Sequence, residues 1–114
     1  MTRVGVESRR FVVVAPSFAE QVRVEVADGY VRVVVTGPLD ADAAATAREM
    51  LLETGELRVR AIVLDLDLVD RLDDRQALIH LLDLAERRCW SARCGLQVTA
   101  KHPDVVEALA AAGL

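Results

Sequence analysis

A two-residue turn between two alternating runs of valine constrains this chain more than any other feature. Six valines alternate with other residues around Asp28-Gly29: Val22, Val24, Val26, Val31, Val33 and Val35. Asp-Gly between alternating runs is the preferred sequence for a tight type I′ β-hairpin. Such a turn pairs Ala27 with Tyr30, which places all six valines on one face and sets Glu25 opposite Arg32 on the other. We therefore predict an antiparallel hairpin with a buried valine face.

The segment after the hairpin predicts a helix and then a buried strand. Asp40 or Asp42 can cap a helix, and Gly55 is its natural stop. The apolar residues between them have helical spacing: Ala43, Ala44, Ala47, Met50 and Leu51. Residues 59–66 form a continuous apolar run, which is typical of a central strand covered on both faces.

Two further helices and one strand are expected in the remaining residues. Asp73 and Gln76 have capping-box spacing, so a helix should begin near Asp73. Its expected buried stripe is Ala77, Leu78, Leu81, Leu82 and Ala85. Residues 96–99 form a short strand, and Pro103 begins a last helix that ends at Gly113 and includes Val106 in its apolar stripe.

Together these elements predict an α/β fold with the order β-β-α-β-α-β-α. In this arrangement a small mixed β-sheet with parallel crossovers is flanked by helices. Residues 1–10 are expected to form a flexible N-terminal tail, and residues 11–114 a single domain. The apolar residues 11–14 could add an edge strand.

Charge and hydropathy argue against several classes of partner. The net charge is −4 and the basic residues are scattered, whereas nucleic-acid binding needs clustered Lys and Arg. No apolar run approaches the roughly 18 residues of a membrane-spanning helix, and the N-terminus has no signal-peptide core. The expectation is a cytoplasmic protein that binds neither nucleic acid nor membrane.

The two cysteines, Cys89 and Cys94, allow two interpretations. They can be small buried side chains at a junction between a helix and a strand, or a redox pair. A zinc site would need two more ligands, and His80 and His102 are poorly spaced for that role.

The acidic stretch that follows the predicted central strand resembles a known regulatory motif. In STAS domains of the anti-sigma factor antagonist type, this place reads apolar-Asp-Ser-(Ser/Thr)-Gly-Leu, and a partner kinase phosphorylates the first Ser. Here residues 72–77 read Leu-Asp-Asp-Arg-Gln-Ala, so Asp74 occupies the phosphoacceptor position. Three other segments resemble family landmarks in the same order: Gly37-Pro38-Leu39-Asp40, Val63-Leu64-Asp65-Leu66 and Ala112-Gly113-Leu114. The resemblance covers about residues 20–114 and implies a STAS-like fold.

The resemblance also implies a function. It predicts a non-enzymatic regulatory domain without cofactors, which binds an anti-sigma factor that has a kinase-like ATP-binding fold. The expected contact surface is the 70–78 loop and the exposed side of helix 74–90. Within it, the candidate residues are Asp70, Asp73, Asp74, Arg75 and Gln76.

Several substitutions depart from the family motif. Asp74 has no hydroxyl for a Ser kinase, Arg75 replaces a small hydroxyl residue, and Gln76 replaces Gly. Pro38 replaces Glu in the segment before the first helix. The alternative is therefore a degenerate STAS module that forms a homodimer or larger homo-oligomer, or senses a small ligand.

Two enzymatic or metal-binding readings compete for the same acidic residues. Asp65 and Asp67 resemble the Asp-x-Asp strand end of haloacid-dehalogenase phosphatases, although that mechanism needs further ligands on later strands. With Asp70, Asp73 and Asp74 they could also bind a divalent cation. A solvated acidic loop beside a helix N-terminus explains these residues more simply. We expect no catalytic residue and no metal site.

Overall fold

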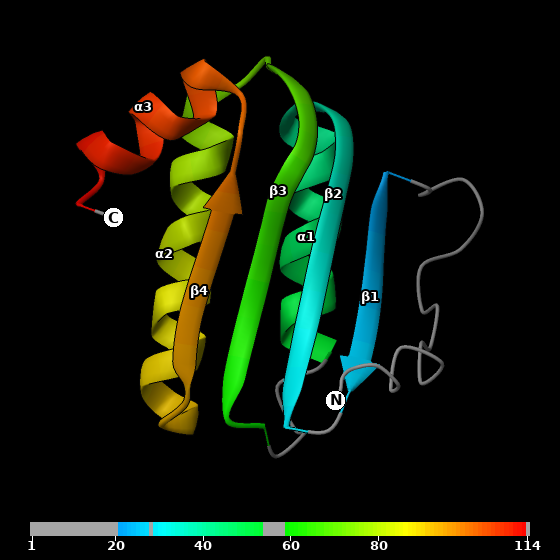
Figure 1. Ribbon diagram of the computed structural model, residues 1–114, viewed down its shortest axis with the longest axis vertical. Helices are drawn as coiled ribbons and strands as arrows, with labels where there is room; N and C mark the ends of the chain where they lie inside the picture. Colours follow the sequence, from blue (N-terminus) through cyan, green and yellow to red (C-terminus); the bar gives the residue numbers. More distant parts are fainter. Residues whose placement is uncertain (1–20, 28, 54–58, 114) are drawn as a thin grey trace.

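The structure is a computed structural model that describes residues 21–27, 29–53 and 59–113. Its elements follow the order expected from the sequence (Figure 1). They are β1 (Val22–Ala27), β2 (Tyr30–Leu39), α1 (Ala41–Glu53), β3 (Ala61–Leu72), α2 (Arg75–Ala92), β4 (Gly95–Ala100) and α3 (Pro103–Ala111). The predicted tail 1–10 and candidate strand 11–14 lie outside the described residues, as do Asp28, Gly55 and Leu114.

The hairpin has the predicted register. β1 and β2 are antiparallel, with Val24 opposite Val33, Glu25 opposite Arg32 and Ala27 opposite Tyr30. Val24 and Val33 are both fully buried. Gly29 has φ of +90°, a backbone conformation that glycine adopts at no steric cost.

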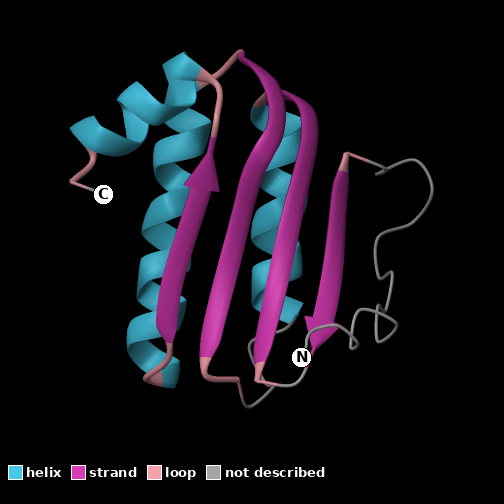
Figure 2. Ribbon diagram, viewed as in Figure 1, coloured by secondary structure: helices cyan, strands magenta, loops and turns pink. Residues whose placement is uncertain are grey.

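The sheet has helices on one face only. Its strand order is β1-β2-β3-β4, with β2, β3 and β4 parallel to one another. Figures 1 and 2 show α1 and α2 behind the sheet, while α3 lies beyond the upper end of β4. The core fills the space between α1, α2 and the sheet and is built from aliphatic side chains, including Leu39, Leu51, Leu64, Leu66, Leu78 and Leu81. In the described part of the chain, no helix covers the opposite, front face of the sheet.

Strands β2 and β3 are longer than expected, which corrects two predicted boundaries. The sequence placed the end of the hairpin at Gly37 and the end of the central strand at residue 66. Instead β2 continues to Leu39 and β3 to Leu72, and the two extensions pair with each other. The pairing shifts register twice, and Gly37 has φ of +82°, as expected at a bulge. Both extensions lie beyond the end of β1, where Pro38 leaves no ladder hydrogen bond to β1 unmade.

The helix ends agree in part with their sequence signals. Pro103 starts α3 as predicted, but Val106 is exposed and not part of the buried stripe. Among the described helices, none is long and apolar enough to cross a membrane.

Candidate functional site

The junction between β3 and α2 is only two residues long. Asp73 and Asp74 connect the strand to the helix, and their backbone N–H groups both donate to the Leu39 carbonyl oxygen, at 3.0 and 3.3 Å. The predicted 70–78 loop is therefore mostly regular structure, because residues 70–72 belong to β3 and residues 75–78 to α2. The junction is held firmly against the end of β2.

Asp74 caps α2, whereas the sequence analysis assigned the cap to Asp73. The Asp74 Oδ1 atom accepts a hydrogen bond from the Ala77 N–H at 3.0 Å, and its carbonyl accepts from Leu78 N–H at 3.2 Å. An N-cap carboxylate satisfies a free helix N–H and lies at the positive end of the helix dipole. The charge at the phosphoacceptor position is thus directed partly into the helix.

Asp73 is engaged by Arg71, two residues earlier. The guanidinium Nε and Nη2 atoms donate to the two carboxylate oxygens of Asp73 at 2.6 and 3.0 Å. This bidentate pair lowers the pKa of the Asp73 carboxyl below its ordinary value. Both side chains face solvent, so the pair shapes the surface more than it stabilises the fold.

The other predicted site residues lie on the surface around this junction. Asp70, Arg75 and Gln76 are exposed, and the Gln76 amide lies 3.2 Å from the exposed His80 ring, one turn along α2. His80 faces solvent, as expected. The described residues include no ion pair between Arg75 and Asp74.

Two residues of this corner were not assigned to the site from the sequence. Arg71 holds Asp73, and Asp40 caps α1 through a 2.8 Å hydrogen bond from the Ala43 N–H. Because β2 and β3 are parallel, the helices that follow them start at the same end of the sheet, each with an Asp cap. The signal for Arg71 was its spacing from Asp73, which places the two within reach once the strand extends to residue 72.

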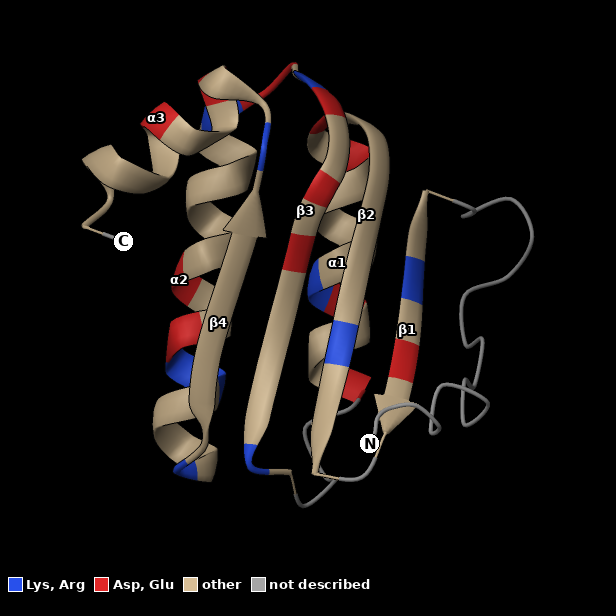
Figure 3. Cartoon of the chain, in the orientation of Figure 1, with Lys and Arg blue, Asp and Glu red and all other residues tan. Residues whose placement is uncertain are grey.

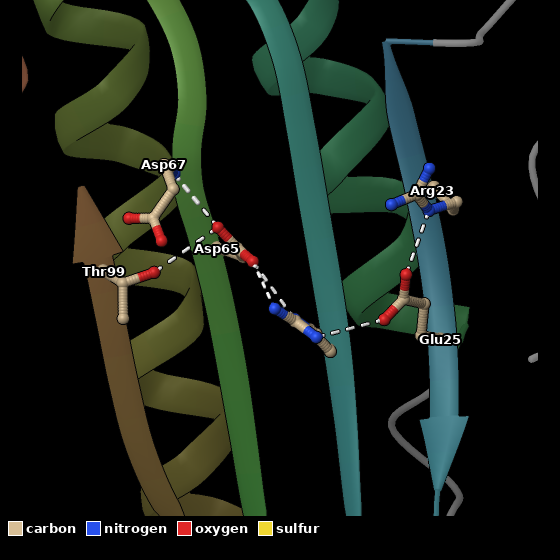
Figure 4. A network of polar contacts seen from close by, with 6 residues as sticks. Arg23, Glu25, Asp65, Asp67 and Thr99 are labelled. Atoms are coloured by element: carbon tan, nitrogen blue, oxygen red, sulfur yellow. Dashed lines mark hydrogen bonds and ion pairs between the residues drawn. The ribbon is translucent and has the colours of Figure 1, made fainter. Parts of the chain in front are cut away.

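Asp65 belongs to a different site, on the front face of the sheet. Charged residues follow one another across β1, β2 and β3 (Figure 3). Asp65 Oδ2 accepts from Arg32 Nε and Nη2 at 3.1 and 2.8 Å, and Oδ1 accepts from the Asp67 N–H at 3.0 Å and Thr99 Oγ1 at 3.4 Å (Figure 4). Arg32 also reaches Glu25 at 3.4 Å.

This network separates Asp65 from the acidic residues of the junction. Both oxygens of Asp65 are committed to protein partners, whereas a phosphatase nucleophile needs one free to attack. No group of three or more His, Cys, Asp or Glu residues in the described ranges is arranged to hold a metal ion.

Cys89 and Cys94 are brought together by the end of α2. The Cys94 N–H donates to the Cys89 carbonyl at 3.0 Å and the Arg93 N–H to the Trp90 carbonyl at 3.3 Å, while Arg93 has φ of 56°. This is a Schellman motif, in which the residues at these two positions commonly touch. Burial, with a smaller effect of Cys94, raises the pKa of the Cys89 thiol to about 12. Both thiols are free, and their action as a redox pair stays a prediction.

Comparisons with known proteins identify the fold. No family model and no curated protein sequence matches the chain. Among solved structures it is similar to the anti-sigma factor antagonist SpoIIAA in its unphosphorylated form, with a TM-score of 0.62 and 16% identity over 75% of this chain and 78% of that one. An anti-sigma factor antagonist from Mycobacterium paratuberculosis gives 0.61 and 22% over 81% and 76%.

A third similar structure, named Mglu, is a longer protein. The TM-score is 0.59 with 24% identity, and the match covers 79% of this chain but only 22% of Mglu. The chain therefore has the STAS-like fold of SpoIIAA, which confirms the predicted fold class, and that fold also occurs as one part of a larger chain.

Proposed function

We propose that this domain is a regulatory interaction module of the anti-sigma factor antagonist type. It binds an anti-sigma factor with a kinase-like fold through the β3–α2 junction and the exposed side of α2. The observation that carries the proposal is the position of Asp74, which caps α2 in a fold shared with SpoIIAA. Asp70, Asp73, Arg75 and Gln76 surround it on the surface.

The geometry suits rigid recognition by a partner. Two backbone hydrogen bonds to Leu39 fix the junction, and the Arg71–Asp73 pair orders the side chain next to Asp74. A surface that is already ordered loses little conformational entropy on binding. The partner reads a fixed corner with carboxylates at Asp40, Asp70, Asp73 and Asp74.

Asp74 makes the module independent of phosphorylation. Its carboxylate supplies about one negative charge, against roughly −1.5 to −2 for a phosphoserine, and fewer acceptor oxygens. Part of that charge is balanced by the helix N-terminus that Asp74 caps. The side chain is therefore an incomplete mimic, which we propose holds the domain in the weakly binding state.

Replacing Asp74 tests this role. Asp74→Ser keeps a capping side chain, so the fold should survive, and the affinity for the cognate anti-sigma factor should rise by at least about tenfold, or about 1.4 kcal/mol. The measurement is titration calorimetry against the kinase-like anti-sigma factors of the host. Adding Arg75→Ser restores both hydroxyls of the family motif.

The matched control is Asp83→Ser, which removes the same charge from an exposed position on the same helix. It should leave the affinity unchanged. If the double variant binds no tighter than the parent chain, the mimic hypothesis is wrong. If neither protein binds any of these partners, the proposed function itself fails.

A second prediction concerns the kinase reaction. The chain has no Ser or Thr between residues 55 and 90. Incubation with an anti-sigma kinase and ATP should therefore leave residues 66–80 unmodified in the parent chain, while Asp74→Ser should accept phosphate. Peptide mapping by mass spectrometry decides the matter, and phosphate on any parent residue from 66 to 80 contradicts the prediction.

A further inference from the structure

The only tryptophan of the chain is almost fully in water. Trp90, near the end of α2, is 86% exposed, although aromatic side chains of this size usually gain free energy by burial. An exposed tryptophan next to other apolar surface is a common anchor of protein interfaces.

Trp90 borders an open hollow between the end of α2 and the edge of the sheet. The hollow has a volume of about 700 Å³ and is lined by Glu86, Cys89, Trp90, Arg93, Cys94 and Leu96. Ile79 and Glu86 are eleven and four residues before Trp90, so all three fall on one flank of the helix. Ile79 is itself 36% exposed.

The neighbouring strand is an unprotected sheet edge. β4 is the last strand of the sheet and contains no charged residue and no proline, the usual devices that prevent an edge from pairing. Leu96, Val98 and Ala100, which face the helices, are only partly buried, whereas the corresponding valines of β2 are fully buried. The core is thus incompletely covered along this edge.

The edge also has backbone groups available for another strand. The Gly95 N–H donates to the Arg60 carbonyl at 2.8 Å, on the β3 side. Successive N–H groups point to opposite sides of a strand, so those of Leu96, Val98 and Ala100 point away from β3. In the described part of the chain, β4 pairs only with β3.

We propose that this surface binds a second copy of the same chain. Two β4 strands pair antiparallel across a two-fold axis, and Trp90 of each copy packs against α2 of the other. The surface is compatible with itself because β4 is uncharged, and the hollow carries one carboxylate, Glu86, and one guanidinium, Arg93. In a chain of net charge −4, a balanced patch of this kind meets its own copy without like-charge repulsion.

This interface is separate from the proposed anti-sigma surface. α2 has 18 residues and is about 27 Å long, with Asp74 before its start and Trp90 near its end. A dimer therefore leaves the β3–α2 junction free, and the inference does not rest on the proposed function.

The test is the association state of the full chain. Sedimentation velocity from about 1 to about 200 μM, a range that detects weak to moderate affinity, should show a monomer converting to a dimer. Trp90→Arg should raise the dissociation constant by at least about tenfold. The matched control is Tyr30→Arg, which changes a partly exposed aromatic residue on the front face of the sheet and should leave association unchanged.

Two further readouts locate the interface. Hydrogen exchange at the amides of Leu96 and Val98 should slow as the dimer forms. Trp90 fluorescence, which is free of other tryptophans, should become less accessible to acrylamide over the same range. A chain that stays monomeric overturns the proposal, whether Trp90 is quenchable or is shielded by the chain's own residues. A dimer that forms equally well with Trp90→Arg overturns it too.

Discussion

At the scale of single residues, the junction shows how two adjacent aspartates acquire different roles. Asp74 turns its carboxylate toward the first turn of α2, whereas Asp73 turns outward and is held by Arg71. A cap charge is compensated by helix N–H groups, and a paired charge by its guanidinium. The surface potential that a partner meets here therefore depends on Arg71 as much as on the aspartates.

The Arg71–Asp73 pair predicts a measurable titration. The pair lowers the pKa of Asp73, so its stabilising effect is present above the unfolded pKa, about 3.9, and is lost as the pH falls through the lower folded value. Arg71→Gln should raise the pKa of Asp73 toward its ordinary value, measured by NMR from the carboxyl carbon shift against pH. Arg87→Gln, which removes a different ion pair on α2, should leave it unchanged. An Asp73 titration that ignores Arg71→Gln would show that the pair does not persist in solution.

At the scale of elements, the end of α2 depends on an uncommon backbone conformation. Arg93 is the one described residue other than glycine with positive φ, in the position that glycine usually takes after a helix. The left-handed conformation costs an L-residue roughly 1–2 kcal/mol, and more when the side chain is β-branched. The helix end that presents Trp90 and both cysteines is therefore set by this residue.

Substitutions at Arg93 should reveal that cost. Arg93→Val should be less stable than Arg93→Gly by at least about 1 kcal/mol, because valine is strained in this conformation and glycine is not. Urea unfolding of both variants at low protein concentration gives the difference. At Ser91, inside the helix, the order should reverse, since glycine is the poorer helix former. Equal stabilities of the two Arg93 variants would contradict the assigned conformation.

The elements that could be predicted are those whose signals are local. The Asp28-Gly29 turn fixed the hairpin register, and Pro103 fixed the start of α3, because a single backbone preference decides each. The extension of β3 to residue 72 was missed because its polar residues pair with β2 rather than bury. The cap at Asp74 was missed for a related reason, as the choice between adjacent aspartates depends on where the strand ends. The exposure of Trp90 has no local signal at all.

At the scale of the whole molecule, the uncovered face of the sheet is joined by one ionic network. Arg32 on β2 bonds Glu25 on β1 and Asp65 on β3, and Asp65 accepts from Thr99 on β4. Both carboxylates are nearly buried, with exposed fractions of 8% for Glu25 and 6% for Asp65. The helices hold the sheet from behind, and this network links all four strands in front.

Removing the central guanidinium should therefore cost more than removing a peripheral one. Arg32→Met leaves Glu25 and Asp65 without their shared cation, and we expect a loss of about 2 kcal/mol or more in the free energy of unfolding, reduced from the fully buried case because Arg32 is half exposed. Arg23→Met removes one contact to Glu25 at the edge of the sheet and should cost less than about 1 kcal/mol. Combining Arg32→Met with Asp65→Asn and Glu25→Gln should recover part of the loss, because no charge is then left unpaired. Urea unfolding of the four proteins gives the comparison, and equal costs for Arg32→Met and Arg23→Met would mean that the sheet is held by its helix-covered face alone.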